Sequence, residues 1–174
     1  MKTLRALFIV EWHWAQSTAD RTNARARQTS RLKLYLPGAL ADKVGNMSKK
    51  EIRHPEKEKS IGAYSAAVEI DGWVHVSGQG PVDPKTGQLI RGSIEDETLY
   101  TLTQMKRILE AAGCTLNDVV KCTVHLADIE DFDRFNAVYR ECFKDVSVLP
   151  ARTTVQSVLW NAIKVEIDCV ARKP

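Results

Sequence analysis

Hydrophobic positions between residues 47 and 174 follow two different periods along the chain. Apolar and polar residues alternate in several short stretches, and this period of two is typical of half-buried strands. The predicted strands are 65–70, 73–77, 119–127, 152–159 and 164–171, with a further short strand near Ile52. Two longer stretches, 93–112 and 131–143, repeat their apolar residues with a helical period. The predicted order is therefore β-β-α-β-α-β-β.

Local signals support these boundaries. Asp71-Gly72 separates the first two strands and is typical of a two-residue hairpin turn. Ser93, with Asp96 three residues later, predicts a capping box at the start of the first helix, and Gly113 suits its C-cap. The predicted buried stripes are Leu99, Leu102, Met105, Leu109 and Ala112 in the first helix, and Phe132, Phe135, Tyr139 and Phe143 in the second.

This order predicts an α+β fold, a mixed β-sheet with two helices packed on one face. The other face of the sheet has no helix left to cover it. Val68, Val74 and Val76 lie on the early strands among polar neighbours, which predicts a partly apolar open face. We therefore expect the domain to form an oligomer through that face.

The last two strands, 152–159 and 164–171, are predicted to form a closing hairpin with its turn near Trp160 to Ala162. Their apolar residues would face the helices, with Arg152, Thr154, Gln156, Lys164, Glu166 and Asp168 on the opposite face. This register would put Thr154 opposite Glu166 and Arg152 diagonally beside it. Periodicity alone favours an ordinary solvated ion pair. The functional alternative is that Arg152 binds a substrate carboxylate while Glu166 orients a water molecule as general base.

Residues 1–46 differ in composition from the rest of the chain. They carry eight basic and three acidic residues, a net charge of +5, whereas residues 47–174 carry a net charge of −2. Two interpretations remain open: an Arg-rich organellar transit peptide, or an extension that precedes a functional start at Met47. We expect a domain at 47–174 that is cytoplasmic, or mitochondrial if residues 1–46 are a transit peptide. The longest apolar run, Leu4 to Val10, is too short to span a membrane.

Other kinds of site are less well supported. The four cysteines contain no C-x-x-C pair, which favours reduced thiols in a reducing compartment. The histidines show no metal-ligand spacing, so no metal site is predicted. The slightly acidic domain argues against strong binding to nucleic acid, for which only the basic segment 1–46 has suitable charge.

Several motifs resemble those of one protein family. Pro-Ala-Arg-Thr-Thr-Val at 150–155 and Val-Glu-Ile-Asp at 165–168 resemble the C-terminal signature of the RidA (YjgF) family of reactive-intermediate deaminases. Four earlier segments also resemble motifs of that family: 61–65 (IGAYS), 76–79 (VSGQ), 83–87 (DPKTG) and 135–139 (FNAVY). The resemblance covers about residues 55–172 in order and without large gaps.

The resemblance implies a chorismate-mutase-like fold and homotrimers with sites in the clefts between subunits. It implies hydrolysis of 2-iminobutanoate and 2-iminopropanoate to 2-oxo acids and ammonia, without a metal or cofactor. Two alternatives stay open: some relatives are described as single-strand ribonucleases and translation inhibitors, and the same trimer could serve as a non-catalytic module that binds small ligands.

The resemblance also implies roles for individual residues. Arg152 corresponds to the carboxylate-binding arginine and Glu166 to the glutamate that positions the attacking water. The implied substrate-binding residues are Tyr64, Ser77, Gly78, Asn136 and Thr154, with Thr154 lining the cleft and not acting as a nucleophile. Two departures affect Glu166. Trp160 stands where many members have proline, and the interval from Arg152 to Glu166 is about one residue shorter than in the bacterial members.

Overall fold

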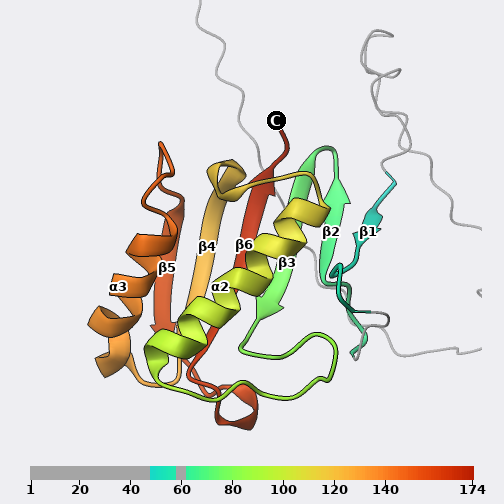
Figure 1. Cartoon of the computed structure of the whole chain (residues 1–174). Coiled ribbons are helices and arrows are strands. Elements are labelled where there is room, and N and C mark those ends of the chain that lie inside the picture. The colour runs from blue at the N-terminus through green and yellow to red at the C-terminus, as the bar shows by residue number, and fades with distance from the viewer. Residues whose placement is uncertain (1–47, 58–61) are drawn as a thin grey trace, which may run out of the picture. The chain divides into compact units, whose positions relative to one another are not determined.

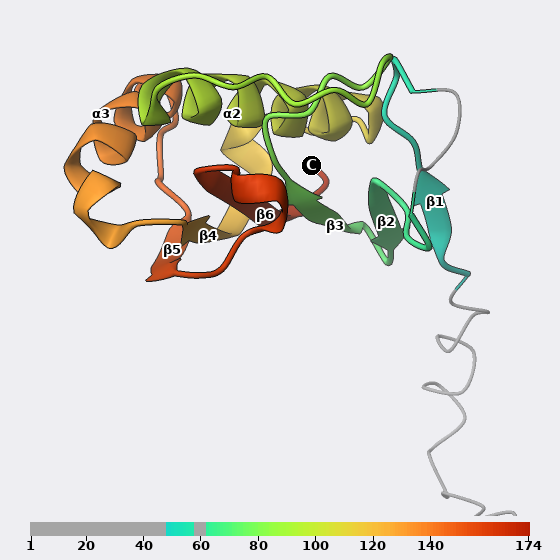
Figure 2. The same ribbon diagram turned by 90° about the horizontal axis from the view of Figure 1, so that it is seen from below.

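Two helices cover one face of a six-stranded sheet in the computed structural model, which describes residues 48–57 and 62–174 (Figure 1). The strands are β1 (Lys50–Ile52), β2 (Ala67–Ile70), β3 (Trp73–Gln79), β4 (Val119–Leu126), β5 (Ala151–Gln156) and β6 (Val165–Arg172). The helices are α2 (Ile94–Ala111) and α3 (Phe132–Cys142), with short 3-10 turns η1 (Leu116–Asp118), η2 (Ile129–Asp131) and η3 (Trp160–Ala162). Figure 2 shows both helices on the same side of the sheet. The predicted α+β class is confirmed.

The local signals in the sequence lie where they were expected. The Ser93 side chain accepts from the backbone N–H of Asp96, and the carboxylate of Asp96 accepts in return from Ser93, which completes the capping box of α2. Gly113, directly after the C-cap residue, has a positive φ of 78°. Asp71 and Gly72 both have positive φ, as a hairpin turn of this type requires. The predicted strand near Ile52 is β1.

The predicted closing hairpin is wrong. The sheet order is β1-β2-β3-β6-β4-β5, so β6 lies between β3 and β4 and forms no ladder with β5. β5 instead pairs in parallel with β4. The physical reason is α3, which connects β4 to β5 as a crossover; a crossover helix returns the chain parallel to the strand that it left. Sequence periodicity describes each strand but contains no information about its partner.

The hydrophobic core lies between the helices and the covered face of the sheet. Val165, Ile167, Cys169 and Ala171 of the central strand β6 are all buried there. Val74 and Val76 are also buried on this covered face, so the expectation that they lie on the open face is wrong; only Val68 of those three lies there.

The helix stripes follow their predictions with one exception. Leu102, Met105, Leu109 and Ala112 of the first stripe are buried, but Leu99 is 54% exposed. In the second stripe Phe135, Tyr139 and Phe143 are buried and Phe132 packs at the edge of the core.

The open face carries a mixture of apolar and charged side chains. Directly opposed residues share a face of a sheet, so the pairs Val68–His75, Ile70–Trp73 and Val170–Lys121 all lie on it. Oligomerisation through this face stays a prediction, as does the boundary at residue 46, because residues 1–46 lie outside the described part of the chain.

All four cysteines are free thiols, and burial raises the pKa of each, most strongly that of Cys169. Among the described residues no helix has the length and apolar content to cross a membrane.

The segment after β1 is anchored to α2 through His54. This side chain is buried, and its Nε2 lies 3.1 Å from Oε1 of Gln104. The backbone N–H of Glu56 donates to Nδ1 at 3.1 Å, so Nδ1 carries no proton and the Nε2–H donates to Gln104. A neutral imidazole fits this arrangement, and burial lowers the pKa of His54.

We expect the stability that His54 provides to decrease with falling pH. Because its pKa is lower in the folded state, only the unfolded chain takes up this proton as the pH falls below about 6.5. In H54Q the glutamine does not titrate. The difference in unfolding midpoint between wild type and H54Q should therefore be larger at pH 7.5 than at pH 5.5. Replacing the exposed His75 by Gln is the control, and an H54Q difference that does not change with pH would contradict the assignment.

Candidate functional site

Arg152 of β5 lies between the edge of the sheet and α3. It is directly paired with Cys122 of β4, which is fully buried, so its side chain points to the helix-covered face. The guanidinium carbon lies 4.5 Å from the ring centroid of Tyr139, 5.5 Å from that of Phe135 and 5.6 Å from that of Phe132. Its Nη2 donates to Oδ1 of Asn136 at 2.8 Å. Three aromatic rings and one amide therefore hold the guanidinium in place.

This guanidinium has no carboxylate partner within 48–57 and 62–174. Two residues further along the same face of β5, the Oγ1 of Thr154 is buried and has no hydrogen-bond partner there. Burial raises the pKa of Tyr139, so the ring over Arg152 stays neutral. The arrangement provides a held cation beside a hydroxyl group, which suits a small carboxylate ligand.

Glu166 of β6 belongs to a second group of residues, on the open face. It is directly paired with His125 of β4 and forms no ion pair within the described ranges, so the predicted alternative of a lysine partner is not seen. A Cβ atom on Gly78 would overlap the Glu166 carboxylate, so only glycine at position 78 lets that side chain lie against β3. The carboxylate is therefore held close to the backbone of β3.

Ser77 and Gly78 lie inside β3, which extends to Gln79, two residues beyond its predicted end. The Ser77 hydroxyl donates to the backbone oxygen of Ser65 at 2.7 Å and so joins β3 to the segment before β2. Tyr64 is 58% exposed and lines a pocket of about 630 Å³ together with Gly78 and Trp160. Gly78 thus lines this pocket with Tyr64 and also lies against Glu166, whereas Ser77 and Glu166 do not line the pocket.

The two groups lie on opposite faces of the sheet. In β4, Cys122 is paired with Arg152 on one side and Cys169 on the other, whereas His125, three residues later, is paired with Val155 and Glu166. Side chains along a strand alternate between the two faces, so Cys122 and His125, three residues apart, point to opposite faces. Arg152 and Glu166, their partners, do the same. The predicted proximity of Arg152 and Glu166 is therefore wrong, and Thr154 is in line with Val124 and Ile167, not with Glu166.

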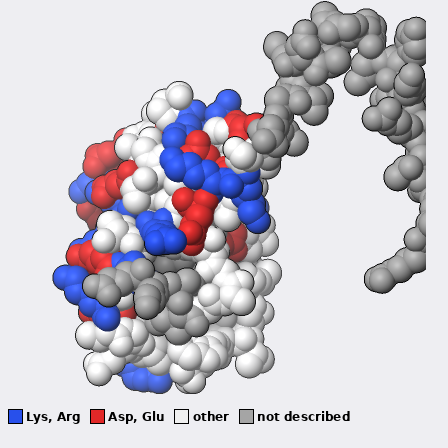
Figure 3. Space-filling model, turned by 90° about the vertical axis from the view of Figure 1, so that its right-hand side faces the viewer, with Lys and Arg blue, Asp and Glu red and all other residues white. Residues whose placement is uncertain are grey.

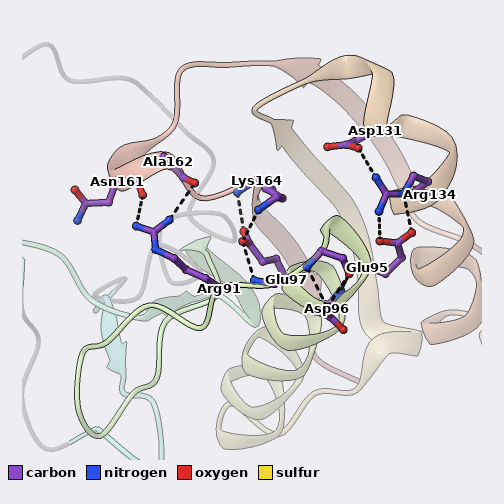
Figure 4. A network of polar contacts seen from close by, with 11 residues as sticks. Arg91, Glu95, Asp96, Glu97, Asp131, Arg134, Asn161, Ala162 and Lys164 are labelled. Carbon is purple, nitrogen blue, oxygen red and sulfur yellow. Dashed lines mark hydrogen bonds and ion pairs between the residues drawn. The ribbon is translucent and has the colours of Figure 1, made fainter.

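The turn that leads into β6 is held by two side chains that the sequence reasoning missed (Figure 4). Asn161 and Ala162 of η3 have positive φ, at 48° and 52°. Arg91 donates to the backbone oxygens of Asn161 at 3.0 Å and Ala162 at 3.5 Å. Non-glycine residues with left-handed φ need support from their surroundings, and these two hydrogen bonds from Arg91 provide it.

Glu97 of α2 binds Lys164, the residue directly before β6. Its side chain is 1% exposed and accepts from Lys164 N at 2.7 Å, from Lys164 Nζ at 3.2 Å and from Gly92 N at 3.4 Å. A buried carboxylate with three donors is a fixed point. It fixes the backbone two residues before Glu166. In the sequence Glu97 resembles an ordinary acidic residue in the first turn of a helix, so it provided no signal.

Comparison with known proteins identifies the family. The family model described as endoribonuclease L-PSP matches residues 55–173, more than half of the chain. The human 2-iminobutanoate/2-iminopropanoate deaminase is 44% identical over 113 residues, which are 64% of this chain and 81% of the human protein. The chain belongs to the RidA/YjgF family.

Further relatives of this RidA/YjgF chain agree in sequence and in fold. A RutC family protein of Pyrococcus horikoshii is 45% identical over 66% of this chain and 90% of its own length. The crystal structure of Escherichia coli TdcF with bound serine is 33% identical, with a TM-score of 0.67, and the match covers 72% of this chain and 99% of TdcF. The mixed sheet with two helices is thus the fold of the RidA/YjgF family.

Charges on this family member are arranged mainly as local pairs. Arg134 of α3 binds both carboxylate oxygens of Glu95 in α2, at 2.8 and 2.7 Å, and Asp131 at 3.1 Å (Figure 4). These hydrogen bonds lower the pKa of Glu95 to about 2. Figure 3 shows basic and acidic side chains intermixed on the side that carries β1 and β2. Within the described residues no group of three or more His, Cys, Asp or Glu side chains is placed to hold a metal ion.

We expect Glu97→Ala to destabilise the RidA/YjgF domain by about 2 kcal/mol, because it leaves partly buried N–H groups of Lys164 and Gly92 without an acceptor. Glu97→Gln retains one acceptor oxygen and should cost about 1 kcal/mol. Urea unfolding measures both values. Glu110, which is exposed and paired only with Lys106, provides the control: E110A should change stability by less than about 0.5 kcal/mol. Equal effects of E97A and E110A would show that the Glu97 contacts do not hold the turn.

Proposed function

We propose that this chain hydrolyses 2-imino acids such as 2-iminobutanoate and 2-iminopropanoate to 2-oxo acids and ammonia. The observation that carries the proposal is the Arg152 guanidinium, which is held by three aromatic rings and Asn136 and has no carboxylate partner among the described residues. The name of the human relative supports the reaction type. The serine bound to TdcF, an amino acid with an α-carboxylate, supports the class of ligand.

Arg152 supplies affinity and orientation. The rings cover its face, and Asn136 occupies one of its N–H groups, so a ligand approaches the remaining N–H groups at its edge. A carboxylate accepts two parallel hydrogen bonds from such an edge. In a 2-imino acid the carboxylate is directly bonded to C2, so fixing the carboxylate also fixes the carbon that water must attack. The hydroxyl of Thr154 is an additional group that this ligand can reach.

The proposed site takes residues from two copies of the chain. Arg152 and Glu166 lie on opposite faces of the sheet, so the guanidinium and carboxylate of one chain do not converge. Arg152 lies on the edge strand β5, where a second chain can approach. We infer that Tyr64, Ser77, Gly78 and Glu166 of a neighbouring subunit complete the site, in the homotrimer that the family resemblance implies.

The chemistry follows from these groups. The carbon–nitrogen double bond of a protonated imine is already electrophilic at C2. Glu166 accepts a proton from water as the water oxygen bonds to C2, and the π electrons move to nitrogen, giving a carbinolamine. The carbon–nitrogen bond then breaks with its electron pair on nitrogen, and the hydroxyl oxygen becomes the carbonyl of the 2-oxo acid. Before nitrogen leaves as ammonia it must gain a proton.

We expect Arg152→Ala to lower the rate of imine hydrolysis about 100-fold, because two charge-assisted hydrogen bonds to the carboxylate are lost. Arg152→Lys should retain part of the activity, since an ammonium group keeps the charge without the fork. The assay generates 2-iminobutanoate from threonine with a threonine dehydratase and measures release of 2-oxobutanoate above the uncatalysed rate.

Arg140, an exposed residue on α3, provides the matched control for the Arg152 variants. R140A should have the activity of wild type, and size-exclusion chromatography should give R152A the same oligomeric state as wild type. Full activity of R152A would refute the proposed function.

Mixed oligomers test whether two subunits share each site. R152A and E166Q, both expected to have little activity alone, are combined one to one by joint refolding. If each site takes Arg152 from one subunit and Glu166 from another, about a quarter of the sites are intact after random assembly. The mixture should therefore recover about a quarter of wild-type activity. A mixture as inactive as its parents would show that both residues must come from one chain.

A further inference from the structure

His125 shares the open face of the sheet with Glu166. The two residues are directly opposed on β4 and β6, and opposed side chains on one face have Cβ atoms about 4.5–5.5 Å apart. His125 is half-buried. On its other side β4 pairs with β5, where Val155 is the directly opposed residue. The two side chains therefore start from opposed positions on one face, with the Glu166 carboxylate against Gly78 of β3 and Val155 on the other side of His125.

Ser157 holds the ring of His125. The Nδ1 of His125 and the Oγ of Ser157 are 2.8 Å apart. Ser157 is itself fixed, because its backbone N–H donates to the backbone oxygen of Leu126 at 2.9 Å. Among the described residues Nε2 of His125 has no hydrogen-bond partner. One ring nitrogen is thus used to orient the imidazole, and the other is left for a ligand or water.

The charged groups around His125 come from the same two strands. Glu166 faces it directly, and Asp168, two residues along β6, is paired with Thr123 on the same face. Lys121 lies further along β4 on this face, but its Nζ donates to the Thr153 hydroxyl at 2.5 Å. On β5 the opposed side chain is uncharged Val155. Glu166 is therefore the nearest charged group across the sheet.

We propose that His125 is the proton-transfer partner of Glu166 in imine hydrolysis. The inference rests on the proposed function and deepens it: Glu166 takes the proton of the attacking water, and a second acid–base group on the same face can protonate the departing nitrogen. Glu166 and His125 occupy directly opposed positions on the open face of the sheet.

The proton balance of the proposed step is complete. Glu166 takes a proton from the attacking water, and protonated His125 gives its Nε2 proton to the carbinolamine nitrogen. That nitrogen leaves as ammonia with the electron pair of the broken carbon–nitrogen bond. The hydroxyl proton moves to the neutral imidazole as the carbonyl forms, and the proton on Glu166 passes to ammonia. Imine cation and water are thus converted to 2-oxo acid and ammonium.

The test compares His125→Phe with wild type in the 2-iminobutanoate assay between pH 5.5 and 8.5. Phenylalanine keeps the bulk of the ring and removes its proton. The proposed step uses the protonated imidazole as its acid, and a lower pH favours that form. The activity of H125F relative to wild type should therefore be about 100-fold reduced at low pH and approach that of wild type at high pH. Taking this ratio cancels the pH dependence of imine formation.

His75→Phe is the matched control. His75 is an exposed histidine on the same face, opposed to Val170 and away from Glu166, so H75F should follow wild type at every pH. Ser157→Ala leaves the His125 ring in place but unoriented and should give a smaller loss with the same pH trend. S157A also decides the question if H125F does not fold. A wild-type pH profile for H125F or for S157A would overturn the assignment of His125.

A second measurement does not depend on turnover. Addition of 2-oxobutanoate, the stable product, to the full chain should shift the imidazole NMR signals of His125 but not those of His75. No shift at His125 would overturn the proposal even if the enzyme is active. A wild-type chain that releases no 2-oxobutanoate above the uncatalysed rate refutes the proposed function and this inference together, whereas an active wild type with an unchanged H125F refutes only the inference.

Discussion

The pairing register of β4 with its two neighbours is the constraint on which the whole site depends. Cys122 is paired with Arg152 of β5 and Cys169 of β6, and His125 is paired with Val155 and Glu166. Because side chains alternate strictly along a strand, these pairs divide the polar residues between two faces. A shift of one residue in either ladder would exchange the faces. The proposed chemistry therefore depends on backbone hydrogen bonds of β4, which lie outside the candidate site.

The α3 helix contributes both to core packing and to the surroundings of the Arg152 guanidinium. Phe135 and Tyr139 are buried in the hydrophobic core and at the same time cover the Arg152 guanidinium. Asn136, between them in sequence, points its amide oxygen at the same group. Burying a guanidinium without a counterion costs free energy, and the aromatic faces and the amide offset part of this cost. A carboxylate ligand would offset more, so the core itself favours an anion at this position.

How much was predictable from the sequence differs between local and long-range features. Ser93 with Asp96, Asp71-Gly72 and Gly113 act within a few residues of themselves, and each predicted its structural role correctly. The partner of β5 depends on the path of α3 and on the central position of β6, about which alternation in residues 152–159 contains no information. The motif containing Arg152 pointed to a guanidinium that aromatic rings and Asn136 hold without a carboxylate partner among the described residues, although the hairpin used to explain it does not exist.

The same distinction explains why the residues that support Glu166 were missed. Arg91 acts through backbone oxygens of residues 161 and 162, and Glu97 through the backbone and side chain of Lys164. Such contacts depend on two distant segments meeting, so neither residue type nor spacing reveals them. They fix the turn that precedes β6, because Arg91 binds the backbone of left-handed Asn161 and Ala162 and Glu97 binds Lys164. Glu166 lies two residues further on, alternates with buried Val165 and Ile167, and therefore faces the open side of the sheet, where it lies against Gly78.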